Sequence, residues 1–225
     1  MGGFPAVQFL PEDQRRTVLQ EYIDAVVFRD IVERYRITNI SLIKYLIKTL
    51  IKNVSSPFTV HKFYNDVKSQ GLKASKDAIH QYCHYLEDAF LIFTVPIFTE
   101  SLRKMHVNPK KIYAIDNGLV CANRLGISLK MGNLFENQIY LDLRRLGRKV
   151  CYYRTKEGYD IDFVVENPNG SFELLQAVWD INDPKTLERE ERALRHAENE
   201  LGIQGRIVTP DDYLYNVFGM NQSRI

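Results

Sequence analysis

The chain has 225 residues, of which 45% are hydrophobic and 26% are charged, a composition typical of a globular protein. This composition excludes a disordered, collagen-like or fibrous chain, and the length predicts one or two domains. Thirty Lys and Arg residues against 28 Asp and Glu residues give a formal net charge of +2, so the overall charge identifies no partner.

The cysteines and the hydrophobic pattern indicate a cytoplasmic protein. Cys83, Cys121 and Cys151 lie far apart in the sequence, and this odd, scattered set predicts neither a zinc site nor a disulfide framework. No segment reaches the roughly 18 uninterrupted apolar residues of a membrane span. The first ten residues also lack the basic and apolar regions of a signal peptide, so we expect no membrane contact.

The predicted elements begin with two helices. Apolar residues at helical spacing predict a first helix from about residue 12 to residue 35. A second helix is expected from about residue 40 to residue 53, with three lysines in one column at Lys44, Lys48 and Lys52.

Charge is uneven along the chain. Between Arg36 and Lys111 there are 12 Lys and Arg against 5 Asp and Glu, a net charge of +7, whereas the remainder carries −5. Such a basic region is the usual footprint of a surface that binds a polyanion, although solvated lysines on helix faces would give the same count.

The basic region reads as a winged-helix domain over residues 36–111. Thr59 and Ser75 can cap two helices that Gly71 separates, which is the helix-turn-helix pattern. A strand, a polar basic return over residues 101–111 and a second strand follow. The second helix would then enter the major groove of DNA, where the amide of Gln81 can read adenine. The predicted nucleic-acid contacts are Lys73, Lys76, His80, Gln81, His84, Arg103 and Lys104. A winged helix that binds only proteins is the alternative.

The last third predicts a helix, three hairpin-linked strands, a helix and a returning strand, hence an α+β fold with a mixed sheet. Asp160 and Asp162 share one face of the second strand, and Glu136 lies on the first helix. A carboxylate in an apolar strand is costly unless it is paired or binds a cation such as Mg²⁺.

Several motifs resemble a known family. Glu136, Asp162 and the strand LLQAV look like the core of the PD-(D/E)XK nucleases. More closely, GNLFENQIYLDLRRLG, YYRTKEGYDIDFVV and the early GGFPAV resemble the region that follows the ATPase module of prokaryotic AAA-type ATPases. The resemblance implies a linker region over residues 1–35, the winged helix, and a restriction-endonuclease-like α/β domain over residues 112–225.

Two departures from this family shape the functional expectation. No G-x-x-x-x-G-K-[ST] motif occurs, so ATP binding requires an upstream ATPase module, in cis or in trans. The resemblance places Gln176 at the third metal ligand and Val178 at the catalytic lysine, a role that Lys156 or Lys185 could take if either folds inward.

We therefore expect a DNA-binding module with a degenerate, catalytically inactive nuclease-like domain. The chain itself would hold no cofactor, apart from Mg²⁺ at a remnant site formed by Glu136, Asp162 and Gln176. The alternatives are an active divalent-metal-dependent endonuclease and a protein-interaction module. The sequence leaves the oligomeric state open.

Overall fold

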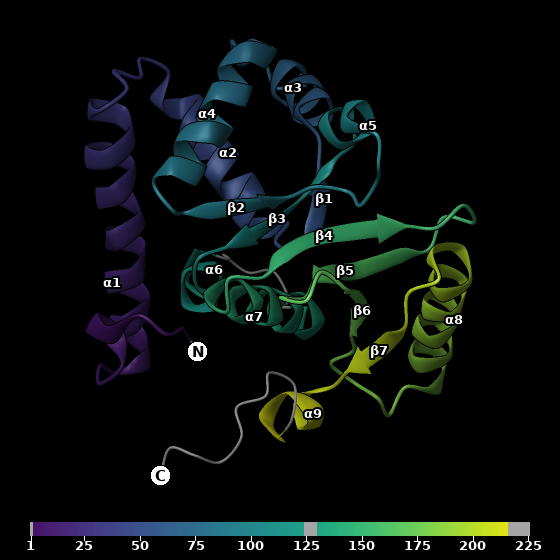
Figure 1. Cartoon of the computed structure of the whole chain (residues 1–225). Helices are drawn as coiled ribbons and strands as arrows, with labels where there is room; N and C mark the ends of the chain where they lie inside the picture. Colours follow the sequence, from purple (N-terminus) through teal and green to yellow (C-terminus); the bar gives the residue numbers. More distant parts are fainter. Residues whose placement is uncertain (1, 124–129, 216–225) are drawn as a thin grey trace. The chain divides into compact units, whose positions relative to one another are not determined.

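The computed structural model describes residues 2–123 and 130–215, which form two compact units (Figure 1). Unit 1 comprises Met1–Val95 and Pro109–Leu129, and unit 2 comprises Pro96–Asn108 and Lys130–Ile225. Residues 96–108 therefore belong to unit 2 although strands of unit 1 flank them in sequence. The predicted boundary between residues 111 and 112 differs from this division, because the following segment to residue 129 belongs to unit 1.

Unit 1 begins with a short 3-10 helix at Pro5–Val7 and the long helix α1 at Glu12–Ala25. A π-helical stretch at Val26–Glu33 continues α1. The helix expected over residues 12–35 is therefore confirmed, although its second part is π-helical instead of α-helical. Helix α2 spans Ile40–Lys52. It buries one continuous apolar face, made by Leu42, Ile43, Leu46, Ile47, Leu50 and Ile51.

Three further helices and a small sheet complete unit 1. Helix α3 spans Val60–Ser69, α4 spans Lys76–Asp88 and α6 spans Asn117–Asn123. The predicted caps are confirmed, because Thr59 accepts a hydrogen bond from Lys62 N and Ser75 accepts one from Ala78 N. The strands are β1 (Ser56–Phe58), β2 (Ile92–Val95) and β3 (Lys110–Ala114), which pair antiparallel in the order β1-β3-β2.

The N-terminal glycines pack against the start of α6. The carboxylate of Asp116 accepts hydrogen bonds from Gly3 N at 2.5 Å and from Leu119 N at 3.1 Å, so it ties both segments together. A Cβ atom added at Gly118 would lie 2.8 Å from the Cα of Gly2. Only glycine allows these two backbones to approach so closely.

Unit 2 is built on a four-stranded mixed sheet, as predicted. Its strands are β4 (Lys149–Arg154), β5 (Asp160–Glu166), β6 (Phe172–Ala177) and β7 (Gly205–Val208). The first three pair antiparallel in chain order, and β7 joins β6 in parallel. The α+β class of the fold is thereby confirmed.

Four helices belong to unit 2, within the part of the chain that the structure describes. They are α5 (Leu102–Val107), α7 (Met131–Arg145), α8 (Pro184–Leu201) and α9 (Pro210–Tyr215). The segment expected as a basic return loop thus contains helix α5, which begins where Ser101 caps Lys104 N. Helix α8 covers β5 and β6. Its buried residues Ala193, Leu194 and Ala197 form one core cluster with Ile161, Val164 and Leu174 of the two strands. None of the helices in the described ranges has the length and apolar character of a membrane span.

The glycine contact predicts opposite effects for two matched substitutions. Gly118→Ala should destabilise the protein by about 1–3 kcal/mol, because the added methyl group meets backbone that has no room to yield. Gly132→Ala, on helix α7 with no atom within 4 Å of the added Cβ, should instead stabilise by about 0.5–1 kcal/mol. Urea denaturation of both variants measures the difference, and equal stabilities would contradict the tight contact.

Candidate functional site

Helix α4 presents a polar face to solvent. Lys76, His80, Gln81 and His84 are all exposed and recur at helical spacing, so they share one side of the helix. The opposite side buries Ile79, Tyr82 and Leu86. Lys73, in the turn before α4, is exposed as well. The structure thus brings together five of the seven residues that the sequence predicted for nucleic-acid contact.

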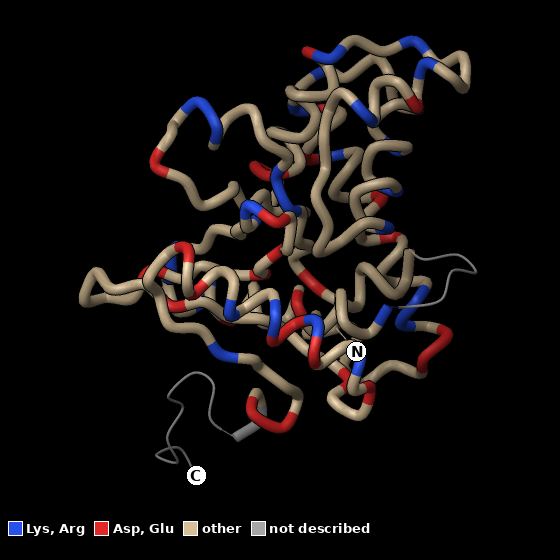
Figure 2. Tube along the Cα trace, turned by 90° about the vertical axis from the view of Figure 1, so that its right-hand side faces the viewer, with Lys and Arg blue, Asp and Glu red and all other residues tan. Residues whose placement is uncertain are grey.

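Charges on this face are mixed. His84 Nε2 lies 3.5 Å from Asp88 Oδ2, so that imidazole already faces a carboxylate. Lys76 Nζ lies over the ring of Tyr64, 5.6 Å from its centre. This cation–π contact stabilises the ammonium group and leaves its positive charge in place. Figure 2 shows Lys and Arg interspersed with Asp and Glu along the traces of both units. The positive charge of this face therefore comes from Lys73, just before α4, and from Lys76, the first residue of α4.

The other two predicted nucleic-acid contacts lie elsewhere. Arg103 and Lys104 are exposed on α5, which belongs to unit 2, whereas α4 belongs to unit 1. The sequence suggested one continuous wing because it could not reveal which unit residues 96–108 join. The segment 96–108 pairs with strand β4 instead. Phe98 N donates to Tyr152 O at 2.6 Å, and Tyr152 N donates to Pro96 O at 3.0 Å.

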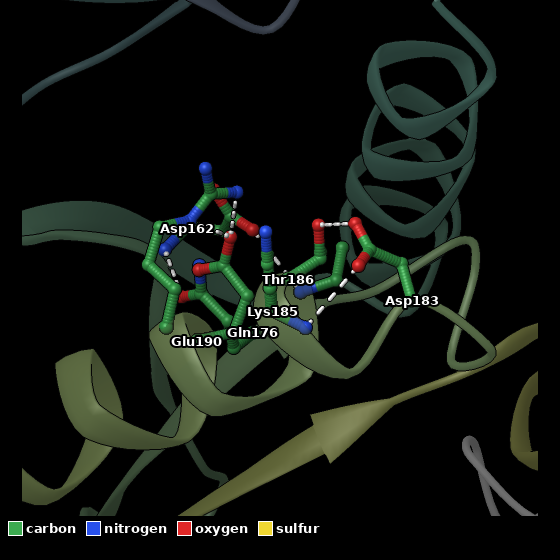
Figure 3. A network of polar contacts seen from close by, with 8 residues as sticks. Asp162, Gln176, Asp183, Lys185, Thr186 and Glu190 are labelled. Atoms are coloured by element: carbon green, nitrogen blue, oxygen red, sulfur yellow. Dashed lines mark hydrogen bonds and ion pairs between the residues drawn. The ribbon is translucent and has the colours of Figure 1, made fainter.

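A second candidate site is the buried polar cluster where β5, β6 and α8 meet (Figure 3). Asp162 and Gln176 are buried, with 8% and 4% of their surface exposed. Asp162 N donates to Gln176 Oε1 at 3.1 Å, and Ala177 N donates to Asp162 Oδ2 at 3.0 Å. The other end of the amide, Gln176 Nε2, donates to Glu190 Oε2 at 2.7 Å.

These bonds continue the sheet beyond its regular pairing. The backbone register of β5 and β6 runs from Glu166–Phe172 to Phe163–Leu175. Immediately beyond it, the side chains of Asp162 and Gln176 satisfy backbone N–H groups of the neighbouring strand. The two predicted metal ligands on the strands therefore bond to each other's strand, which satisfies the requirement for partners of a buried carboxylate.

Sequence reasoning missed Glu190 and Arg189 of α8. Glu190 accepts from Arg189 Nη2 at 2.5 Å as well as from Gln176, so it links the strands to the helix surface. One signal could have revealed it: Glu190 precedes Ala193 and Ala197 by three and seven residues, which places it on the buried side of α8.

The remaining residues of the predicted nuclease site lie on other segments of unit 2. Glu136 is buried on α7 and Val178 is buried just after β6. Lys185 extends from the first turn of α8 to the side of the cluster in Figure 3, and no ion pair joins its ammonium group to a described carboxylate. Lys156 instead lies in the β4–β5 turn, where its backbone N donates to Glu200 near the far end of α8. Ten residues of helix, about 15 Å, separate Glu190 from Glu200.

Hydrogen bonds within the protein already engage the two strand residues of this cluster, Asp162 and Gln176. Within the described ranges, no group of three or more His, Cys, Asp or Glu side chains could hold a metal ion. The carbonyl oxygen that Gln176 would offer a cation already accepts from Asp162 N. As they stand, these residues form a hydrogen-bonded network, and Mg²⁺ binding remains a sequence-based prediction.

A separate network fixes the β4–β5 hairpin to the end of α8. Tyr153 OH donates to Glu200 Oε2 at 2.6 Å. Burial, followed by this bond and the charge of Glu200, raises the pKa of Tyr153 to about 12. The same bond lowers the pKa of Glu200, which also accepts from Lys156 N.

Burial raises the pKa of the Cys83 thiol to about 12, so this cysteine is no candidate nucleophile.

Comparison with known proteins identifies the family of this two-unit α+β protein. The family described as Domain of unknown function (DUF8612) matches residues 1–130, more than half of the chain, and the chain therefore belongs to it. An uncharacterised protein of Methanocaldococcus jannaschii, MJ1544, is 31% identical over 94% of this chain and 48% of its own length. An uncharacterised protein of Haemophilus influenzae is 28% identical over 72% of this chain and 40% of its own length.

The chain thus spans about half the length, or less, of the curated relatives that it matches. No solved structure matches it.

The polar cluster predicts a cost for removing its central amide. Gln176→Leu removes the acceptor of Asp162 N–H and the donor to Glu190 Oε2, so the free energy of unfolding should fall by about 1–3 kcal/mol. The same change at exposed Gln204 should have an effect within about 0.5 kcal/mol. Urea denaturation of both variants measures the free energies of unfolding. An unchanged value for Gln176→Leu would show that the network does not stabilise the fold.

The hairpin network predicts a pH dependence. Because the pKa of Glu200 is lower in the folded state, its stabilising contribution is present above its ordinary pKa of 4.5 and is lost as pH falls through the folded value. Glu200→Gln should therefore be less stable than the parent protein near neutral pH, and the difference should shrink in acid. Thermal unfolding across this range measures the difference, and a pH-independent gap would contradict the assignment.

Proposed function

We propose that this chain is a DNA-binding module in which helix α4 of unit 1 enters the major groove. The observation that carries the proposal is the order α2-β1-α3-α4-β2-β3 of the elements of unit 1, with the sheet order β1-β3-β2, which supports a winged helix. In the chain, α5 of unit 2 stands between β2 and β3. In this arrangement the second helix of the helix-turn-helix pair reads DNA. Gln81 would supply base recognition, and Lys73 and Lys76 would contact phosphates.

The chemistry of α4 favours DNA over a protein partner. Protein interfaces concentrate aromatic and apolar side chains in a central patch. Helix α4 exposes no large hydrophobic side chain, and Leu72 and Phe90 flank it only beyond its two ends. Its polar amide, imidazole and ammonium groups instead suit phosphate and base edges.

For unit 2 we propose a degenerate, inactive relative of the PD-(D/E)XK nucleases. The order α7-β4-β5-β6-α8-β7, with β7 parallel to β6, supports this relationship. Buried Val178 takes the place of the catalytic lysine, and an aliphatic side chain cannot stabilise phosphoryl charge. The mutual hydrogen bonds of Asp162 and Gln176 support a structural role for this remnant site, and Mg²⁺ would add no activity there.

The resemblance to AAA-type ATPases supports a nucleotide-driven partner for this module. We propose that an ATPase module, in cis or in trans, supplies ATP hydrolysis, because the chain has no P-loop motif. The greater length of both relatives is compatible with a further module in those proteins.

The DNA-binding proposal predicts steep salt dependence. Lys73→Glu/Lys76→Glu should weaken duplex binding roughly tenfold or more and reduce the slope of log affinity against log salt by about 2. The control Lys149→Glu/Lys156→Glu reverses the charge of two exposed lysines of unit 2, and it should change the affinity for duplex DNA much less. Fluorescence anisotropy over a salt series is the measurement. Binding by the parent chain that ignores salt, or no binding at all, would favour the protein-interaction alternative.

The inactive assignment predicts that the purified chain leaves supercoiled plasmid intact with Mg²⁺ or Mn²⁺. The active endonuclease is the second candidate function, because Lys185 lies at the side of the Asp162 cluster in Figure 3. Cleavage that disappears in both Asp162→Ala and Lys185→Ala would establish that activity and overturn our proposal.

A further inference from the structure

Arg36 adopts an unusual backbone conformation for a residue with a side chain. Its φ of 51° lies in the left-handed region, at the end of the π-helical stretch. Ile37 N donates to Val32 O at 3.0 Å, and Arg36 N donates to Glu33 O at 3.3 Å. This is the helix-ending pattern in which glycine is the favoured residue, because it has no Cβ. An arginine stands at a position where glycine would cost less backbone strain.

The Arg36 side chain is available for a ligand. The residue is exposed, and its guanidinium group makes no hydrogen bond or ion pair with the part of the chain that the structure describes. Lys73 is likewise exposed, and its ammonium group has no carboxylate partner among the described residues.

Asn39 joins the segment of Arg36 to the turn that carries Lys73. Its Oδ1 accepts from Leu42 N at 3.1 Å, which caps α2, and its Nδ2 donates to Lys73 O at 2.8 Å. Arg36 and Asn39 are three residues apart, so their Cα atoms are separated by at most about 11 Å. The backbone of Arg36 and the backbone of Lys73 therefore both lie near Asn39.

We propose that Arg36 and Lys73 form a phosphate-binding corner for the backbone of duplex DNA, with Asn39 as the positioning residue for Lys73. The inference rests on the DNA-binding function proposed for α4 and extends its contact surface to the start of α2. An arginine fork and a lysine suit phosphate oxygens. Ile40 and Leu72, beside the corner in the sequence, are 41% and 38% exposed.

Arg36→Gly separates stability from binding. Glycine relieves the left-handed conformation, so the melting temperature should stay the same or rise. Duplex affinity should fall roughly threefold or more, and the salt slope should decrease by about 1, since one phosphate contact is lost. The control Lys44→Ala removes a cation of α2 that already lies 3.6 Å from Asp24 Oδ1, and its affinity should be close to that of the parent.

A double-mutant cycle tests Asn39. Asn39→Ser keeps a good helix cap but is too short to reach Lys73 O. It should weaken DNA binding in the parent chain and have no further effect in a Lys73→Ala background. The same loss in both backgrounds would show that Asn39 does not act through Lys73.

The outcomes separate this inference from the proposed function. If the α4 lysine reversals weaken binding and Arg36→Gly does not, the DNA-binding function stands and the corner is wrong. If the parent chain does not bind duplex DNA, both fall. A polyglutamate peptide serves as the second probe, and a loss of its binding in Arg36→Gly without a loss for DNA would assign the corner to acidic proteins and overturn the proposal.

Discussion

A carboxylate buried within an apolar strand must find hydrogen-bond partners, and this constraint organises unit 2. Asp162 meets it by accepting from Ala177 N, while Gln176 accepts from Asp162 N and passes the network on to Glu190. Each of these bonds joins two elements of the sheet–helix layer. The polar cluster thus helps to position α8 over β5 and β6, in addition to the apolar contacts of its alanines and leucines.

The same network bears on the chemistry of the unit. The amide of Gln176 is hydrogen-bonded at both ends, to Asp162 N and to Glu190 Oε2. A valine occupies the position that the family resemblance gives to a lysine, and it is buried. Both observations fit the structural role proposed above for this cluster.

Unit 1 follows a different design, in which an apolar helix supports a polar one. Helix α2 buries a full face against its neighbours, and Asn39 at its start holds the turn before α4. The exposed residues of α4 can therefore be polar without cost to the core. Arg36 is a further exposed polar residue of unit 1. Its left-handed backbone conformation costs some local stability, and its side chain remains exposed to solvent.

The sequence by itself determined the local elements, because each depends on neighbouring residues. Helical periodicity, the caps Thr59 and Ser75, and the strand patterns were sufficient for helices α1 to α4 and for the mixed sheet of unit 2, whereas α6 was not predicted. Tertiary structure alone decided that residues 96–108 join unit 2, through backbone bonds to Tyr152 that carry no residue-type signal. It also decided the partners of Asp162 and the junction of Asn39 with Lys73, since side-chain contacts between distant segments depend on how the chain packs.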